Sequence, residues 1–123
     1  MAIEWDEQIV IAELSDEPAL SDELGTLGDR LSAIADDDRV PHVVISFGNV
    51  SYINSSNIAQ LLRVRKRVSQ AHKAMRLASV SEDVWSVMVV TGLDRVFTFA
   101  PDTMTAIAGL QLEMENAGEG ADE

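Results

Sequence analysis

The fold of this chain is decided by residues 43–58, which read VVISFGNVSYINSSNI. The segment opens with consecutive apolar residues, which are typical of a strand that is buried on both faces of a parallel sheet. A turn at Gly48-Asn49 follows, and then the polar run Asn54-Ser55-Ser56-Asn57. From Ile58 onward, apolar residues recur at helical spacing. A buried strand, a turn and a helix in this order predict an α/β unit.

The residues before this segment predict two strands and a helix. Residues 8–14 are apolar and β-branched, and Ile3 and Trp5 indicate a short strand before them. Residues 15–18 (SDEP) offer Ser or Asp as a helix cap and an early proline. The helix then carries one apolar stripe, formed by Leu20, Leu24, Leu27, Leu31 and Ile34. Gly25 and Gly28 would weaken it by roughly 1 kcal/mol each, or would allow close packing.

The residues after the segment continue the alternation of strands and helices. We predict a strand at 75–80, a helix that Ser81 caps and Gly92 ends, and a strand at 96–99. A last helix starts near Pro101, with an apolar face of Ile107, Leu110 and Leu112. The order β-β-α-β-α-β-α-β-α predicts an α/β domain with a mixed, largely parallel sheet of about four or five strands and about four helices. We expect this domain in residues 1–115 and an acidic, disordered tail in 116–123.

Charge is distributed unevenly along the chain. Residues 1–38 carry −11, residues 39–81 carry +7, and residues 82–123 carry −8, for a net charge of −12. This excess of carboxylates argues against direct binding to nucleic acid. The basic middle third either forms a charged face or pairs with acids of the flanking thirds.

Other chemistry-bearing patterns are scarce. Cysteine is absent, the N-terminus lacks a basic and apolar leader, and the apolar runs are too short to span a bilayer. We therefore expect a cytoplasmic protein with no membrane insertion. Asp36-Asp37-Asp38 matches no calcium loop, and neither His42 nor His72 has a triad-like context. We expect no cofactor, no metal and no enzymatic activity.

Asn54-Ser55-Ser56-Asn57 stands where a helix begins and four backbone N–H groups lack helical partners. Asn and Ser satisfy such donors, so the run predicts an N-cap. The same free N–H groups and the positive end of the helix dipole favour an anion, such as a phosphoryl group on either serine. A phosphoryl group would add roughly −1.5 to −2 charges to this surface.

Several segments together resemble one known family, the STAS-domain anti-sigma factor antagonists. Residues 43–58 resemble its hydrophobic strand, short turn and (F/Y)-M-D-S-S-G-L motif. Residues 89–97 (VVTGLDRVF) resemble its L-x-x-T-G-L-D-R-V-F motif, and residues 76–81 (RLASVS) resemble the strand and turn before the third helix. Residues 12–16 (AELSD) loosely resemble a G-E-L-D segment. The resemblance covers about residues 3–112.

The resemblance implies partner switching in bacterial transcription regulation. The unphosphorylated antagonist would bind an anti-sigma factor that is also a serine kinase, and phosphorylation would release it. By position the acceptor is Ser55, with Ser56 in reserve, and a separate serine phosphatase would reset the protein. The partner-binding residues it implies are Asn54, Ser55, Ser56, Asn57 and Asp16, with Arg63 and Arg67 at the rim. We expect a monomer or a weak dimer.

Two departures from the family pattern keep alternatives open. Asn54 replaces the family Asp and removes a negative charge, and Asn57 replaces the family Gly. They favour a second hypothesis, a STAS module that is never phosphorylated and serves as a scaffold or subunit of a larger signalling or lipid-transport complex. A third, more distant hypothesis is a small hydrolase that uses Ser55 with a remote histidine.

Overall fold

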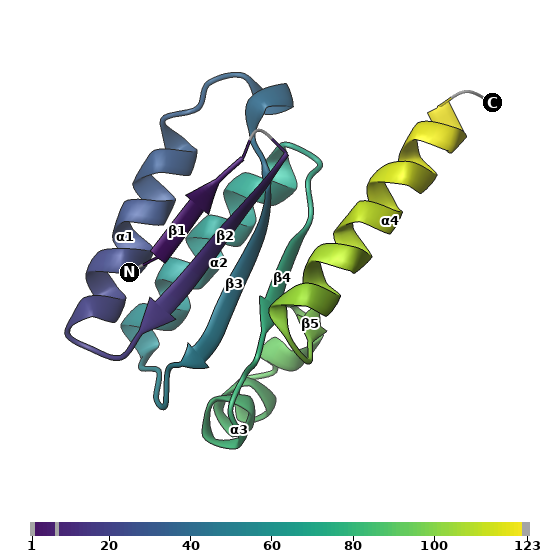
Figure 1. The fold of residues 1–123 in the computed structure, drawn as a ribbon. Helices are drawn as coiled ribbons and strands as arrows, with labels where there is room; N and C mark the ends of the chain where they lie inside the picture. Colours follow the sequence, from purple (N-terminus) through teal and green to yellow (C-terminus); the bar gives the residue numbers. More distant parts are fainter. Residues whose placement is uncertain (1, 7, 122–123) are drawn as a thin grey trace.

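The computed structural model describes residues 2–6 and 8–121 of the chain. In this part the predicted order of elements and the α/β fold class are confirmed, with two short 3-10 helices in addition (Figure 1). The strands are β1 (Ala2–Trp5), β2 (Ile9–Ser15), β3 (His42–Asn49), β4 (Met75–Ala78) and β5 (Phe99–Ala100). The helices are α1 (Ala19–Ser32), η1 (Asp37–Arg39), α2 (Ser55–Gln70), α3 (Glu82–Val90), η2 (Leu93–Arg95) and α4 (Thr103–Ala121).

The five strands form one sheet in the order β1-β2-β3-β4-β5. β1 pairs antiparallel with β2, and the remaining neighbours pair in parallel. In the β2–β3 ladder Ile9 lies opposite His42, and after a register shift Ser15 lies opposite Asn49. The parallel strands therefore all end at one edge of the sheet, which is the lower edge in Figure 1. The loops after β2 and β3 meet at this edge.

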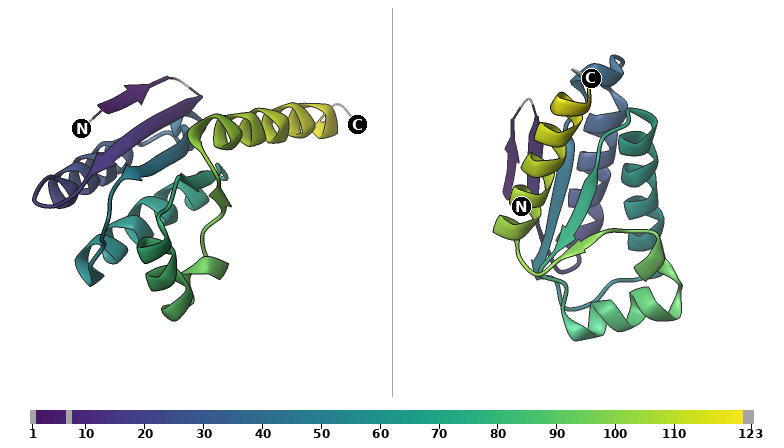
Figure 2. Two further views of the ribbon diagram at one scale, coloured as in Figure 1. Left: turned by 60° about the horizontal axis from the view of Figure 1, so that its bottom comes forward. Right: turned by 90° about the vertical axis from the view of Figure 1, so that its right-hand side faces the viewer.

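The two faces of the sheet are covered unequally. On the inner face, α1 and α2 pack on the sheet and form the main core with residues such as Leu24, Leu61 and Ile45, which are fully buried or nearly so. On the outer face, α4 alone covers Val44 and Ala78 with its own Ala106 and Leu110. Figure 2 shows α4 on the side of the sheet opposite α1 and α2. The larger core explains the long apolar stripe of the predicted first helix.

Several helix ends lie where local sequence predicted them. Ser81 caps α3, because its Oγ accepts a hydrogen bond from the Val84 N–H at 3.2 Å. Gly92 has φ of 78°, the left-handed conformation that ends a helix. The start of α1 was predicted less well, because neither Ser15 nor Asp16 caps it. Instead the carboxylate of Glu17 accepts from both the N–H and the hydroxyl of Ser21, each at 2.6 Å.

The prediction of a strand at 96–99 was wrong in its position. After Gly92 the chain forms the 3-10 helix η2, and the N–H groups of Val96 and Phe97 both donate to the Leu93 carbonyl, at 3.0 and 3.1 Å. These local hydrogen bonds use the donors that a strand would need. Phe97 packs into the core, and β5 begins only at Phe99.

The last helix is longer than the sequence suggested. Its backbone is helical from Thr103 to Ala121, past residue 115, where we expected the domain to end. Residues 122–123 of the expected tail lie outside the described residues. Leu110 is buried and Ile107 is half-buried, as expected, but Leu112 is exposed. No described helix is both long enough and apolar enough to cross a membrane.

The glycines of α1 allow α2 to approach closely. A Cβ at Gly28 would lie 3.1 Å from an Nη atom of Arg63, and one at Gly25 would lie 3.7 Å from Gln60 Nε2. Polar side chains of α2 therefore lie directly over the α1 backbone. Close packing therefore accounts for Gly28, whereas an added Cβ at Gly25 would make only an ordinary van der Waals contact.

We expect Gly25→Ala to raise the free energy of unfolding by roughly 0.5–1 kcal/mol, because alanine is the better helix former and the site has room. Urea denaturation followed by circular dichroism measures this change. Gly92→Ala is the matched control and should lower stability by about 1–2 kcal/mol, because its positive φ strains any residue with a Cβ. Changes of the same sign in both variants would contradict this account.

Candidate functional site

The candidate site is the first turn of α2, at the edge where the parallel strands end. Asn54 is the N-cap, and its side-chain oxygen accepts from the Asn57 N–H at 2.9 Å. In return Asn57 Oδ1 accepts from the Asn54 N–H at 3.0 Å. This reciprocal capping box confirms the predicted cap. It leaves Ser55 and Ser56 exposed in the first turn.

The free backbone donors of this turn coincide with the exposed serines. Within the described part of the chain, no hydrogen bond is made by the N–H of Ser55 or Ser56. The first turn also contains no acidic residue. Free N–H groups and the helix dipole together make this end of α2 favourable for an anion.

The side chain of Asn57 makes its contacts inside the protein rather than at the surface. It is fully buried, and its Nδ2 donates to Ser21 Oγ on α1 at 3.5 Å. One turn later, Gln60 Nε2 donates to the Ser21 carbonyl at 2.8 Å. The side chain of Asn57 therefore holds the start of α2 against the start of α1. Its effect on a partner would be indirect, through the position of the serines.

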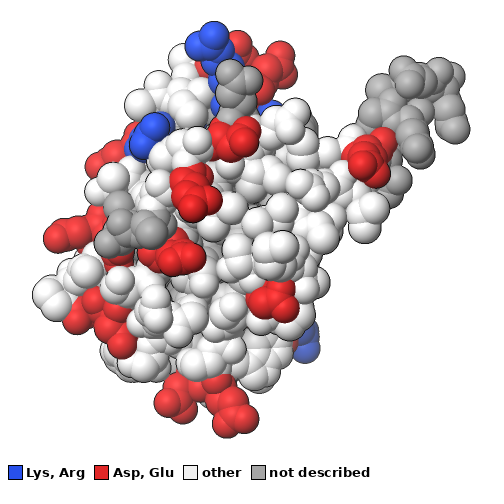
Figure 3. Space-filling view, viewed as in Figure 1, with Lys and Arg blue, Asp and Glu red and all other residues white. Residues whose placement is uncertain are grey.

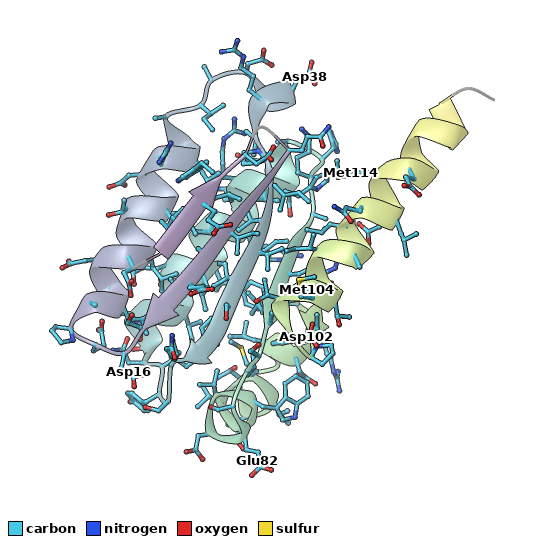
Figure 4. All side chains as sticks on the ribbon, viewed as in Figure 1. Asp16, Asp38, Glu82, Asp102, Met104 and Met114 are labelled. Carbon is cyan, nitrogen blue, oxygen red and sulfur yellow. The ribbon has the colours of Figure 1, made fainter. Side chains whose placement is uncertain are left out.

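Asp16 joins the loop after β2 to the loop after β3. Its two carboxylate oxygens accept from the N–H and the hydroxyl of Ser51, at 2.8 and 2.7 Å, across 35 residues of sequence. These hydrogen bonds lower the pKa of Asp16 below its ordinary value of 3.8. Figure 4 shows Asp16 where β2 ends, at the opposite end of the molecule from Asp38. Asp16 therefore lies at the edge of the sheet where α2 begins, and its contact with Ser51 was not predicted.

A second carboxylate lies beside the site. The hydroxyl and the N–H of Ser21 lower the pKa of Glu17, and the side chains of Asn57 and Asn54 lower it further. Glu17 is thus linked through Ser21 to the capping box. Local sequence contains no signal for this link, because Asn54 and Asn57 lie far from Glu17 along the chain.

Tyr52 was also missed by sequence reasoning. It precedes the capping box by two residues, and 63% of its surface is exposed. Its neighbour Ile53 is buried and anchors the loop in the core. A large aromatic side chain held in solvent next to a polar turn is typical of a protein-binding surface. The available signal was a large aromatic residue two positions before the predicted N-cap.

The predicted rim residues Arg63 and Arg67 lie further along α2 and face other elements. Arg63 Nη2 pairs with Asp29 Oδ1 at 2.9 Å, and Arg67 Nη1 pairs with Asp37 Oδ1 at 2.8 Å. Arg67 also donates to the Ile34 carbonyl at 2.7 Å. For these two bases, pairing with acids of the N-terminal third is the interpretation that the contacts support.

Neither histidine lies near Ser55. His72 follows the end of α2, whereas Ser55 starts that helix, so the helix length of about 24 Å separates them. His42 begins β3 at the opposite edge of the sheet, and its Nδ1 accepts from the Ala74 N–H at 2.9 Å. Burial is the main cause that lowers the pKa of His42. The geometry therefore gives the hydrolase hypothesis no base for Ser55.

Comparison with known proteins agrees with this arrangement. Residues 10–106 match the family model of the STAS domain. A comparison with curated protein sequences finds no match. An anti-sigma factor antagonist (STAS) domain protein from Planctomyces limnophilus is 20% identical, with a TM-score of 0.75 over 89% of this chain and 97% of that one.

Two further solved structures share the fold. The anti-sigma factor antagonist SpoIIAA in its unphosphorylated form is 17% identical, with a TM-score of 0.72 over 89% of this chain and 95% of that one. A chain from the structure of the stressosome, described as a signal integration and transduction hub, is 13% identical, with a TM-score of 0.68 over 92% and 98% of the two chains. At these identities the likeness establishes the fold.

We expect Asp16→Asn to loosen the loop after β3, because a neutral amide binds the Ser51 N–H and hydroxyl less strongly than a carboxylate does. Amide hydrogen exchange of Ser51 should become faster, whereas Asp22→Asn, on the exposed surface of α1, should leave that exchange unchanged.

The same hydrogen bonds predict a pH dependence. In the wild-type protein, the stabilisation of the loop by ionised Asp16 is present above pH 3.8 and is lost as the pH falls through the lowered pKa of Asp16. Equal exchange of Ser51 in wild type and Asp16→Asn would contradict this role.

We expect Asn57→Gly to lower the free energy of unfolding by roughly 1–2 kcal/mol, because it removes half of the capping box and the contact with Ser21. Thermal and urea denaturation measure the loss. Ser56→Gly is the matched control, with the same propensity cost in the same turn but no buried side chain. An equal loss in both variants would show that Asn57 contributes only helix propensity.

Proposed function

This chain belongs to the STAS domain family, and on that premise we propose that it is an anti-sigma factor antagonist controlled by phosphorylation of Ser55. In this role it binds an anti-sigma factor that is also a serine kinase. The observation that carries the proposal is the first turn of α2, where an exposed serine hydroxyl lies beside unpaired backbone N–H groups on a rigid, capped helix.

The unphosphorylated protein would present a preorganised, polar docking surface. Tyr52 would be its aromatic anchor, with Asn54, Ser55 and Ser56 around it. The Asp16–Ser51 hydrogen bonds hold the loop that carries Tyr52 before any partner arrives. Less conformational entropy is then lost on binding, which favours affinity.

Phosphorylation would oppose that docking in two ways. It would place roughly −1.5 to −2 charges in a surface that a partner must desolvate. It would also add this charge to a site that already holds the carboxylates of Asp16 and Glu17. The phosphoryl group itself would be stabilised by the N–H groups at the start of α2, so the modified protein stays folded while it loses its partner.

Ser55 is the preferred acceptor, and Ser56 is the reserve. Ser55 takes the position of the family acceptor, directly after the N-cap residue. In such a reaction the chain is a substrate: the nucleotide and magnesium belong to the kinase, and a serine phosphatase would return the protein to its docking state.

A second candidate is a STAS module that is never phosphorylated, within a larger signalling complex. The observation that favours it is the buried Asn57, which replaces the family Gly and adds a hydrogen bond from α2 to α1. A first turn that is held to α1 in this way suits a permanent interface.

The decisive experiment captures the partner from cell extract, incubates the purified pair with Mg-ATP, and maps phosphate by mass spectrometry. We expect phosphate on Ser55 and at least about tenfold weaker binding afterwards, which corresponds to about 1.4 kcal/mol. Ser55→Ala should bind but stay unmodified, and Ser55→Glu should bind weakly.

Ser56→Ala is the matched control, because it removes a neighbouring exposed hydroxyl and should keep both binding and modification. Phosphate on Ser56 alone would contradict Ser55 as the acceptor and would make Ser56 the phosphorylation site. A kinase-competent partner that binds this edge yet modifies neither serine would overturn the switch and leave the scaffold candidate.

A further inference from the structure

The outer face of the sheet is only half covered. α4 buries Val44 and Ala78, but Ile9 and Ile11 of the neighbouring strand β2 are only partly buried. In α/β proteins, parallel strands are normally covered by helices on both faces. On this face β2 and β1 have no helix of their own among the described residues (Figure 2).

Between α4 and β1 the surface forms a trough. Its floor is Ile9 and Ile11, one wall is Ile107 of α4, and the other wall carries Glu4, which lies opposite Ile11 in the β1–β2 ladder. The hollow has a volume of about 330 Å³. Met114, labelled in Figure 4, lines a neighbouring hollow that shares Gln8 and Gln111 with the trough.

The rim of the trough is acidic. Glu4 and Glu13 are exposed on the same side of the sheet as Ile9 and Ile11, and Asp6 lies at the end of the trough. No described residue that lines the hollow is a lysine or an arginine. Figure 3 shows Asp and Glu over β1 and β2, next to an uncharged region that extends to α4.

We propose that this trough binds a basic amphipathic helix of a partner protein. The apolar side of that helix would cover Ile9, Ile11 and Ile107, and its lysines or arginines would meet Glu4 and Glu13. Bound in this way, it would lie beside α4 as a second helix and complete the outer layer of the sheet. Helices that place an apolar stripe in a hydrophobic groove are a common mode of recognition, and opposite charge speeds their encounter.

Charge argues against the other occupants of this shape, and the apolar face of the chain's own basic helix, α2, is buried in its core. A second copy of the chain would offer its own helix α4, whose residues 103–121 contain no lysine or arginine and include Glu113 and Glu115. Its carboxylates would meet those of the trough. Nucleic acid and anionic lipid would be repelled by the same rim.

The trough is separate from the switch. It lies on the outer face between β1 and α4, whereas Ser55 lies beyond the edge where β2 and β3 end. Both surfaces are therefore accessible at the same time. The proposal goes beyond the antagonist function and does not depend on phosphorylation.

The test uses the full chain and a synthetic peptide of about 18 residues, long enough to be helical, with Leu and Lys at amphipathic spacing. We expect it to bind in calorimetry and to shift the amide signals of Ile9, Ile11 and Ile107 in NMR spectra. A peptide with Glu in place of Lys should not bind. The double variant Glu4→Gln and Glu13→Gln should weaken binding about tenfold.

Two matched controls separate this site from general attraction to an acidic protein. Glu82→Gln with Asp83→Asn removes the same charge on exposed α3 and should change affinity less than about twofold. Ile107→Ser should weaken binding, whereas Leu112→Ser, on the same helix but outside the trough, should not. Equal losses in paired variants, no binding of the Lys peptide, or a dimer that protects Ile9 and Ile11 would each overturn the proposal. Ser55→Ala should bind the peptide as wild type does.

Discussion

The structure depends first on the parallel pairing of β2 with β3. Parallel strands end at one edge, so this pairing brings the loop after β2 beside the loop after β3 although they are far apart in sequence. Asp16 and Ser51 then join the loops through two hydrogen bonds. From that fixed edge α2 begins, and its capped first turn presents Ser55 and Ser56. The position of the candidate switch is thus a consequence of strand direction.

Charge has two different roles in this molecule. Within the fold, three bases of the middle third pair with acids of the flanking thirds: Arg63 with Asp29, Arg67 with Asp37, and Arg76 with Glu113. These pairs link α2 to α1 and η1, and β4 to α4. Other carboxylates, such as Glu4 and Glu13, stay exposed and give the outer face its negative character. The net charge of −12 therefore does not show where the negative charge lies on the surface.

The sheet carries two surfaces that differ in polarity and charge. The edge at the start of α2 is polar and already holds the carboxylates of Asp16 and Glu17, so the addition of one phosphoryl group makes it strongly negative. The trough on the outer face is apolar with an acidic rim, and a single modification at Ser55 would change it little because the two sites are separate. A protein with both surfaces can exchange one partner while it keeps another. That combination suits the partner switching that we propose for this chain.

The sequence by itself determined the order of strands and helices, the N-cap at Asn54, the cap at Ser81 and the turn at Gly92. Each of these depends on apolar periodicity or on hydrogen bonds within about four residues, which local sequence contains. The prediction from sequence misplaced β5, because nothing in the local sequence showed that the Leu93 carbonyl would accept hydrogen bonds from the N–H groups of Val96 and Phe97 in a 3-10 turn. Only the tertiary structure decided the partner of Asp16, the burial of Asn57 and the trough beside α4. These arise from contacts between segments distant in sequence, and their geometry exists only once the sheet has assembled.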